Sequence, residues 1–266
     1  MNTSNSASLE LPDSLHAEQV GPVLVVRLTR PAKRNALNDA TVLGLERIFT
    51  SIPDGVGAVV LRGEGDHFCA GLDLSELRDR DAVEGVFHSR MWHRVFDSIQ
   101  FGSVPVIAAL HGAVIGGGLE LACAAHIRVA EPSAFYALPE GQRGIFVGGG
   151  GSVRVPKLIG VARMADMMLT GRVYSADEGL SIGLSQYRVE AGAGYGKALE
   201  LANKIAGNTR MTNFAILHAL PRIAEASHDT GLMLEALMAS VAQSAPEAKQ
   251  RLEQFLNKQA KKVGEA

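Results

Sequence analysis

Short apolar runs and helically spaced apolar positions alternate along the first two-thirds of the chain. The continuous apolar, β-branched runs are typical of strands that are buried on both faces of a sheet. Strands that alternate with helices favour parallel βαβ units, so the pattern predicts an α/β fold. We expect strands at 20–28, 57–61, 104–110, 127–130 and 135–138, and helices at 39–49, 81–100 and 119–125.

The last third of the chain carries helical spacing almost throughout. Apolar positions predict helices at 162–169, 176–180 and 194–206, and an entirely helical end from about residue 212 to residue 262. The first 14 residues are rich in Ser and Asn and are expected to form a loose arm. We therefore predict an arm at 1–14, a core domain at 15–206 and a helical region at 207–266.

Composition and charge are those of an ordinary globular protein. The 266 residues, 47% of them hydrophobic, are enough for one large domain with a sizeable core. A formal net charge of −2 gives no electrostatic support for a nucleic-acid partner. No apolar run reaches the ~18 residues that span a bilayer, and the N-terminal residues lack the pattern of a secretory signal. We expect a cytoplasmic protein without a membrane partner.

The cysteines and histidines indicate no metal site. Cys69 and Cys123 stand far apart, outside any CxxC pair, and are expected to be reduced thiols. The eight histidines show no HExxH motif and no other metal spacing. A GxSxG motif is also missing from the sequence, which leaves little support for a serine hydrolase.

A single acid, Glu120, stands in the otherwise apolar segment 113–125. An unpaired buried carboxylate is costly, so this side chain either has partners or lies at an exposed helix N-terminus. Three glycines, 116–118, precede it and permit close approach of the backbone. The first N–H groups of a helix lack acceptors, so the segment could form an oxyanion cradle. A tight turn with close helix packing is the alternative.

A second glycine turn and a second acid complete the candidate chemistry. Gly71 permits a sharp turn that could point the N–H of Leu72 into a cleft. Glu140 follows Pro139, twenty residues beyond Glu120, where a solvated loop acid is the alternative. If folding brings the two acids together, different environments can separate their pKa values, so that one acts as base and the other as acid.

Five segments together resemble the crotonase (enoyl-CoA hydratase/isomerase) family, over nearly the whole chain. They are TRPAKRNALN at 29–38, VVLRGEGDHFCAGLDLSEL at 59–77, AALHGAVIGGGLELACAAHIRVA at 108–130, ALPEGQRGIFVGGGGSVRVPKLIG at 137–160 and LTGRVYSADEGLSIGL at 169–184. The resemblance implies a spiral of ββα units with a C-terminal helical trimerisation region. It also implies homotrimers, two of which commonly pair as a hexamer.

The resemblance implies an enoyl-CoA hydratase of fatty acid metabolism, which adds water in syn fashion to a 2-trans-enoyl-CoA. Backbone N–H groups of Leu72 and Gly117 would form the oxyanion hole for the thioester oxygen. Glu120 would act mainly as base toward the water, Glu140 mainly as acid toward C2, and the Gly148 N–H would contact the same water. Coenzyme A is part of the substrate, so no cofactor is expected.

The same resemblance implies where the acyl-CoA would bind. The implied CoA-binding residues are Lys33, Ala36, Leu37 and Ala70, with Phe255 and Lys258 reaching in from a neighbouring subunit. The implied acyl-pocket residues are Leu77, Val86, Phe87 and Trp92, although the aromatic side chains of this helix could equally be ordinary core.

Several positions depart from the family pattern and leave alternatives open. Val147 and Gln250 stand where proline and glycine are common, and Arg143 could pair with Glu140 and lower its pKa. An enoyl-CoA isomerase or another acyl-CoA-processing enzyme would use the same oxyanion hole. A non-catalytic CoA- or RNA-binding protein is the second alternative, and salt-sensitive RNA binding without turnover would distinguish it.

Overall fold

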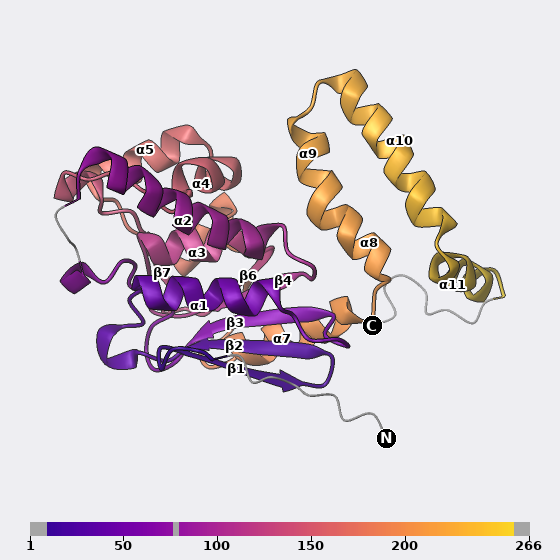
Figure 1. Cartoon of the computed structure of the whole chain (residues 1–266), viewed down its shortest axis with the longest axis horizontal. Helices are drawn as coiled ribbons and strands as arrows, with labels where there is room; N and C mark the ends of the chain where they lie inside the picture. Colours follow the sequence, from indigo (N-terminus) through magenta and orange to yellow (C-terminus); the bar gives the residue numbers. More distant parts are fainter. Residues whose placement is uncertain (1–9, 77–79, 258–266) are drawn as a thin grey trace.

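A computed structural model describes residues 10–76 and 80–257 of the chain. It shows an α/β core from which a group of C-terminal helices projects to one side (Figure 1). The core is an α/β fold, as expected from the sequence. Within the described residues, the core contains a six-stranded sheet and a three-stranded sheet.

The larger sheet is almost entirely parallel. Its strand order is β1-β2-β3-β4-β6-β9, and only β1 runs antiparallel to its neighbour. These strands are β1 Leu15–Val20, β2 Val23–Leu28, β3 Ala58–Gly63, β4 Val106–Leu110, β6 Ile127–Ala130 and β9 Tyr187–Arg188. The strand predicted at 20–28 begins too early in the sequence: β2 starts only at Val23, because Gly21, at φ 60°, turns the chain between β1 and β2.

Two apolar clusters cover the two faces of this sheet. Alternate residues of β2, β3 and β4 pack against α1 Asp39–Thr50 and α2 Ala82–Gln100 on one face. The remaining residues of the same strands pack against α7 Gly194–Ala206 on the other face. This arrangement confirms the interpretation of the continuous apolar runs as strands buried on both faces.

The smaller sheet carries the turns that build the candidate site. Its strands are β5 Ala113–Ile115, β7 Phe135–Ala137 and β8 Tyr174–Ser175, in the order β5-β7-β8. β5 leads into α3 Gly117–Ala124, and β7 leads into the 3₁₀ turn Gly141–Arg143. Because β5 and β7 pair in parallel, from Ala113 with Phe135 to Ile115 with Ala137, their carboxyl ends meet at one edge.

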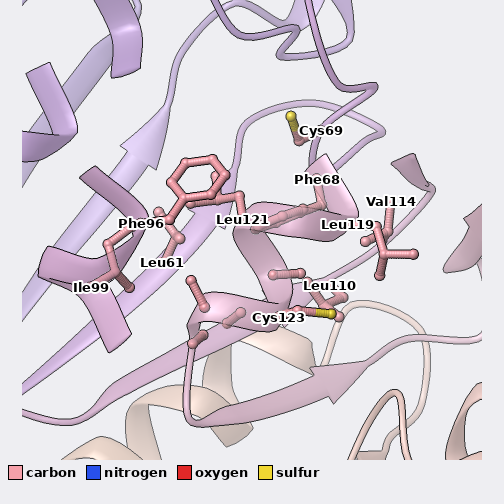
Figure 2. Close-up of a cluster of buried hydrophobic side chains, with 14 of the residues drawn as sticks. Leu61, Phe68, Cys69, Phe96, Ile99, Leu110, Val114, Leu119, Leu121 and Cys123 are labelled. Atoms are coloured by element: carbon pink, nitrogen blue, oxygen red, sulfur yellow. The ribbon is translucent and has the colours of Figure 1, made fainter. Parts of the chain in front are cut away.

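Helix α3 is buried along its whole length and is held by the core on several sides. Figure 2 shows Leu119 and Leu121 of α3 in a cluster with Phe96 and Ile99 of α2. The remaining core helices are α4 Gly151–Ile159, α5 Val161–Thr170 and α6 Ala176–Ile182. Short 3₁₀ turns also lie at Pro31–Lys33 and Leu74–Glu76. Close packing of this kind fixes the position of any functional group on α3.

The C-terminal part is helical, as expected, but consists of several segments. They are α8 Arg210–Phe214, a π-helical turn Ala215–Ala219, α9 Leu220–Glu225, α10 His228–Ser244 and α11 Pro246–Leu256. The chain leaves helical geometry at Ala226 and again at Ala245, before Pro246. The predicted boundary at residue 207 stays a prediction, and most of the arm predicted at 1–14 lies outside the described residues. Within residues 10–76 and 80–257, no helix is long and apolar enough to cross a membrane.

Candidate active site

A cavity of about 340 Å³ opens where the smaller sheet meets α2. Its walls come from the turn at 70–72, the N-terminus of α3, one side of α2 and the segment 139–149. Both candidate acids, Glu120 and Glu140, line it. Folding therefore brings together the two carboxyl groups that stand twenty residues apart in the sequence.

Two backbone amides at this cavity are free to bind an anionic oxygen. The carbonyl of Gly71 accepts a hydrogen bond from the N–H of Leu37 at 2.7 Å, so the N–H of Leu72, on the same trans peptide, points the opposite way. The carbonyl of Gly116 accepts from the N–H of Glu120 at 2.9 Å, which directs the N–H of Gly117 outward from α3.

The two amides lie close to each other. A Cβ atom placed on Gly117 would lie 3.5 Å from the nitrogen of Leu72, and one placed on Gly71 would lie 3.1 Å from the nitrogen of Gly117. Neither N–H donates to an acceptor in the part of the chain that the structure describes. Two neighbouring N–H donors can together bind an oxygen that carries negative charge, and the N-terminus of α3 adds a favourable dipole.

Glu120 is buried but has hydrogen-bond donors. Its side chain is 3% exposed, and Oε1 accepts from the N–H of Gly149 at 2.9 Å and of Gly151 at 2.7 Å. Burial raises the pKa of Glu120 to about 6, the two N–H donors oppose this rise, and the carboxyl of Glu140 adds to it. The donors favour the carboxylate, so at neutral pH this group can accept a proton.

Glu140 lines the same cavity, beside Gly116. A Cβ on Gly116 would lie 2.6 Å from its Oε1, so only glycine leaves room for this carboxyl group at the start of α3. Its Oε2 is buried and has no hydrogen-bond partner within the described ranges. Burial raises the pKa of Glu140, and although the Arg143 guanidinium lowers it as expected, it does so by less than burial raises it.

The glycine loop at 148–151 has a role that the resemblance did not imply, while the predicted water contact of Gly148 stays a prediction. The sequence singled out the N–H of Gly148 as a contact to water, and Gly148 does line the cavity. The amides of Gly149 and Gly151, which no sequence pattern singled out, bind the Glu120 carboxylate directly. The run of four glycines was the available signal, but it did not identify which amide faces which acid.

The implied CoA-binding residues are only partly assembled in the single chain. Ala70 lines the cavity, and Lys33 is exposed at the end of the 3₁₀ turn Pro31–Lys33. The side chain of Leu37 is fully buried in the core, so only its neighbours could contact a ligand. Phe255 is exposed on α11, which projects away from the core (Figure 1), and Lys258 lies outside the described residues.

The acyl-pocket prediction requires a correction. Trp92 lines the cavity, but Val86 and Phe87 do not; they are 60% and 70% exposed on the outer side of α2. The residues of α2 that face the cavity are Gly85, His88, Ser89 and Trp92, which are spaced by three or four positions. Leu77 lies outside the described residues. Sequence reasoning also missed other lining residues, among them His88, Ser89, Ile145 and Phe146.

His88 is held in place at the cavity wall. Its Nε2 lies 2.7 Å from Oδ1 of Asp39, and its ring lies 6.1 Å from the ring of Trp92. Within residues 10–76 and 80–257, no group of three or more His, Cys, Asp or Glu side chains could hold a metal ion. Two carboxyl groups in one cavity can transfer protons to and from a bound molecule.

Comparison with known proteins identifies relatives of the chain. Residues 18–265 match the family model described as enoyl-CoA hydratase/isomerase. The short-chain-enoyl-CoA hydratase of Clostridium acetobutylicum is 33% identical over 244 residues, which cover 91% of this chain and 94% of that protein.

Solved structures with similar folds point to the same family. A crystal structure from Rhodopseudomonas palustris CGA009, named as a candidate enoyl-CoA hydratase, is 67% identical with a TM-score of 0.92 and covers 95% of this chain and 98% of its own. The enoyl-CoA hydratase of Bacillus anthracis is 30% identical with a TM-score of 0.86, covering 92% of this chain and 96% of its own.

Proposed function

The chain belongs to the enoyl-CoA hydratase/isomerase family, and on that basis we propose that it is an enoyl-CoA hydratase of fatty acid metabolism. The reaction is the addition of water to a 2-trans-enoyl-CoA, which gives a 3-hydroxyacyl-CoA. One observation carries the proposal: both Glu120 and Glu140 line a single cavity that also contains two free, converging amides. Two carboxyl groups can supply the base and the acid that hydration requires.

The oxyanion hole explains how the thioester would be activated. Its carbonyl oxygen would accept hydrogen bonds from the N–H groups of Leu72 and Gly117. Negative charge grows on this oxygen as water attacks C3, so fixed N–H dipoles stabilise the transition state more than the ground state. The carbonyl of Gly71 and the first turn of α3 already fix the directions of both donors.

The two acids would divide the proton transfers between them. Glu120, which accepts two N–H donors, would take a proton from the water as its oxygen bonds to C3. Glu140, whose Oε2 has no donor among the described residues, would be protonated and would deliver its proton to C2. The electron pair of the C2–C3 double bond forms the new C2–H bond, and one proton then passes from Glu120 back to Glu140. The net change is the addition of one water molecule.

Acid pH should protonate Glu120 and so lower the activity. Because burial raises the pKa of Glu120 to about 6, its carboxylate is present above this pH and is lost as the pH falls through it. We expect kcat/KM to fall about tenfold for each pH unit below about 6, as the free enzyme loses its base. The measurement is kcat/KM for crotonyl-CoA between pH 4.5 and 8, with folding followed by circular dichroism. An activity that stays flat down to pH 4.5 in folded protein would contradict the assignment of the base.

The oxyanion hole should be sensitive to one methyl group at Gly71. Gly71 has φ 91°, and an alanine Cβ there would lie 2.7 Å from the carbonyl oxygen of Ile115, beside the Gly117 amide. We expect Gly71→Ala to lower kcat/KM by about 10²-fold or more, the effect typical of losing an oxyanion donor. Gly55→Ala is the matched control, because Gly55 has φ 84° but an added Cβ meets nothing within 4 Å. Equal losses in both variants would assign the effect to backbone strain alone.

Assembly and location belong to the same proposal. We propose a homotrimer, or a hexamer of two such trimers, in the cytoplasm, with Phe255 and Lys258 contributing to a neighbouring subunit's CoA site. Large apolar side chains exposed on the C-terminal helices support an assembly through this part of the chain; they include Leu232, Met233, Leu237 and Leu252. Light scattering on the purified protein gives the mass that decides between monomer, trimer and hexamer.

The proposed reaction requires no metal and no redox cofactor, and CoA arrives with the substrate.

An activity screen tests the function directly. Short, medium and aryl 2-trans-enoyl-CoA thioesters should lose their conjugated enoyl absorbance with this protein, and the products should gain the mass of one water. A 3-enoyl-CoA that gains absorbance without a mass change would instead indicate an isomerase. If no 2-trans-enoyl-CoA of any length is hydrated, the hydratase proposal is wrong.

A further inference from the structure

We infer that Arg154, on α4, is a positioning residue that holds the glycine loop so that its amides stay directed at Glu120. The inference rests on the proposed function, because it assigns Glu120 the role of base. It concerns a side chain that does not line the cavity and therefore would not contact the substrate. Its effect on the reaction would be exerted entirely through Glu120.

Arg154 connects the glycine loop to α2. The side chain is 7% exposed, and its three nitrogens each donate a hydrogen bond. Nη1 donates to the carbonyl of Gly149 at 3.1 Å, Nε to Oε1 of Gln100 at 2.7 Å, and Nη2 to Oδ1 of Asp97 at 2.5 Å. A planar guanidinium with three fixed partners is rigid, so it transmits the position of α2 to the loop.

The same loop residues are held on their other side by Glu120. Gly149 donates its N–H to Oε1 of Glu120, while its carbonyl is bound to Arg154. The N–H of Gly151 donates to the same Oε1, and the preceding carbonyl, of Gly150, accepts from the backbone N–H of Arg154 at 3.1 Å. The Arg154 side chain thus fixes the peptide that lies between the two donors, and its backbone N–H helps to hold the peptide that carries the Gly151 N–H.

Gly150 shows how closely the loop and the arginine fit. Its φ of 97° is a conformation that favours glycine, and a Cβ on Gly150 would collide with Nη1 of Arg154. A side chain at position 150 would therefore have to displace the guanidinium. A loop that only connected two elements would not require the Gly150 backbone to lie so close to Nη1 of Arg154.

The guanidinium also acts on Glu120 electrostatically. Its positive charge lowers the pKa of Glu120, against the larger rise that burial causes. Other groups contribute to the field at these two side chains: Glu140 interacts with Glu120 in the cavity, and Asp97, His93 and Cys123 interact with Arg154. Removing the side-chain hydrogen bonds of Arg154 should therefore raise the pKa of Glu120 by loosening its N–H donors, and removing the charge as well should raise it further.

Two substitutions separate the geometric effect from the charge effect. Arg154→Lys keeps the charge but loses the guanidinium hydrogen bonds to Gly149 and Gln100. We expect kcat to fall by about 10²-fold, as for a misplaced catalytic group, with little change in KM. Arg154→Met loses both the charge and these hydrogen bonds, and the acid limb of its pH profile should move further to higher pH than that of Arg154→Lys. Asp97→Asn leaves the hydrogen bond from Arg154 to Gly149 in place, so it should lower kcat by less than either substitution of Arg154.

Arg128→Lys is the matched control. Arg128 is equally buried and donates to the carbonyls of Leu184 and Ala125, away from the cavity. We expect it to lower the melting temperature without changing kcat per folded molecule. If Arg154→Lys does no more than this control, and Arg154→Met leaves the pH profile unmoved, then Arg154 only stabilises the fold and the inference is wrong.

A titration separates this inference from the proposed function. The carboxyl carbon of Glu120 can be followed by ¹³C NMR in labelled protein and assigned by its loss in Glu120→Gln. Its pKa should rise in Arg154→Lys, which loosens the two N–H donors, and rise further in Arg154→Met, which also loses the charge, whether or not any enoyl-CoA is hydrated. An unchanged pKa in the Met variant would overturn the inference even if the wild-type protein is an active hydratase.

Discussion

Replacing Glu120 with glutamine should lower kcat for enoyl-CoA hydration by up to about 10⁴-fold, the upper range for loss of a general base. The amide oxygen of glutamine can still accept from the N–H groups of Gly149 and Gly151, so the loop should keep its position. The amide nitrogen cannot take a proton from water. The loss should therefore appear in kcat, while KM and the melting temperature change little.

The measurement is the steady-state rate with crotonyl-CoA, or with the best thioester from the activity screen. Glu200→Gln serves as a control, because Glu200 is an exposed partner of Lys197. A Glu120→Gln variant that turns over at the rate of this control would remove Glu120 from the mechanism.

Glu140→Gln should lower kcat by about 10²- to 10⁴-fold, because it removes the proposed donor of the proton to C2. Glutamine has nearly the same shape, so it can occupy the space that Gly116 leaves for the carboxyl group. Deuterium incorporation at C2 in heavy water provides a second measurement, since the variant should lose it in proportion to hydration. Exchange at C2 at the wild-type rate would exclude Glu140 as the acid.

The double variant Glu120→Gln/Glu140→Gln tests whether the two acids act together. Groups that act as a unit give strongly non-additive losses, so we expect the double variant to be about as slow as the slower single variant. Losses that multiply would instead indicate independent roles. That result would contradict a single water held between the two carboxyl groups.

Much of the core could be predicted from local sequence patterns. The apolar runs of β3 and β4 and the helical spacing of α1 and α2 identified these elements within a few residues. Four strands were missed: β1, β5, β8 and β9. β1 is a largely exposed edge strand, and β5, β8 and β9 have only two or three residues, so their existence depends on tertiary pairing.

The site was predictable only in part, for a related reason. Local sequence marked Glu120 as an acid in an apolar helix, but spacing alone did not place Glu140 beside it. The parallel pairing of β5 with β7 brings the two together, and this pairing is not encoded in either segment alone. Val86 and Phe87 show the reverse error, because apolar character did not reveal which side of α2 faces the cavity.

A crystal structure with a bound 3-hydroxyacyl-CoA product would test the central geometry most directly. We predict the thioester oxygen within about 3 Å of the nitrogens of both Leu72 and Gly117. The 3-hydroxyl group should lie within hydrogen-bonding distance of both Glu120 and Glu140. A thioester bound elsewhere, or a hydroxyl that contacts neither carboxyl group, would contradict the proposed mechanism.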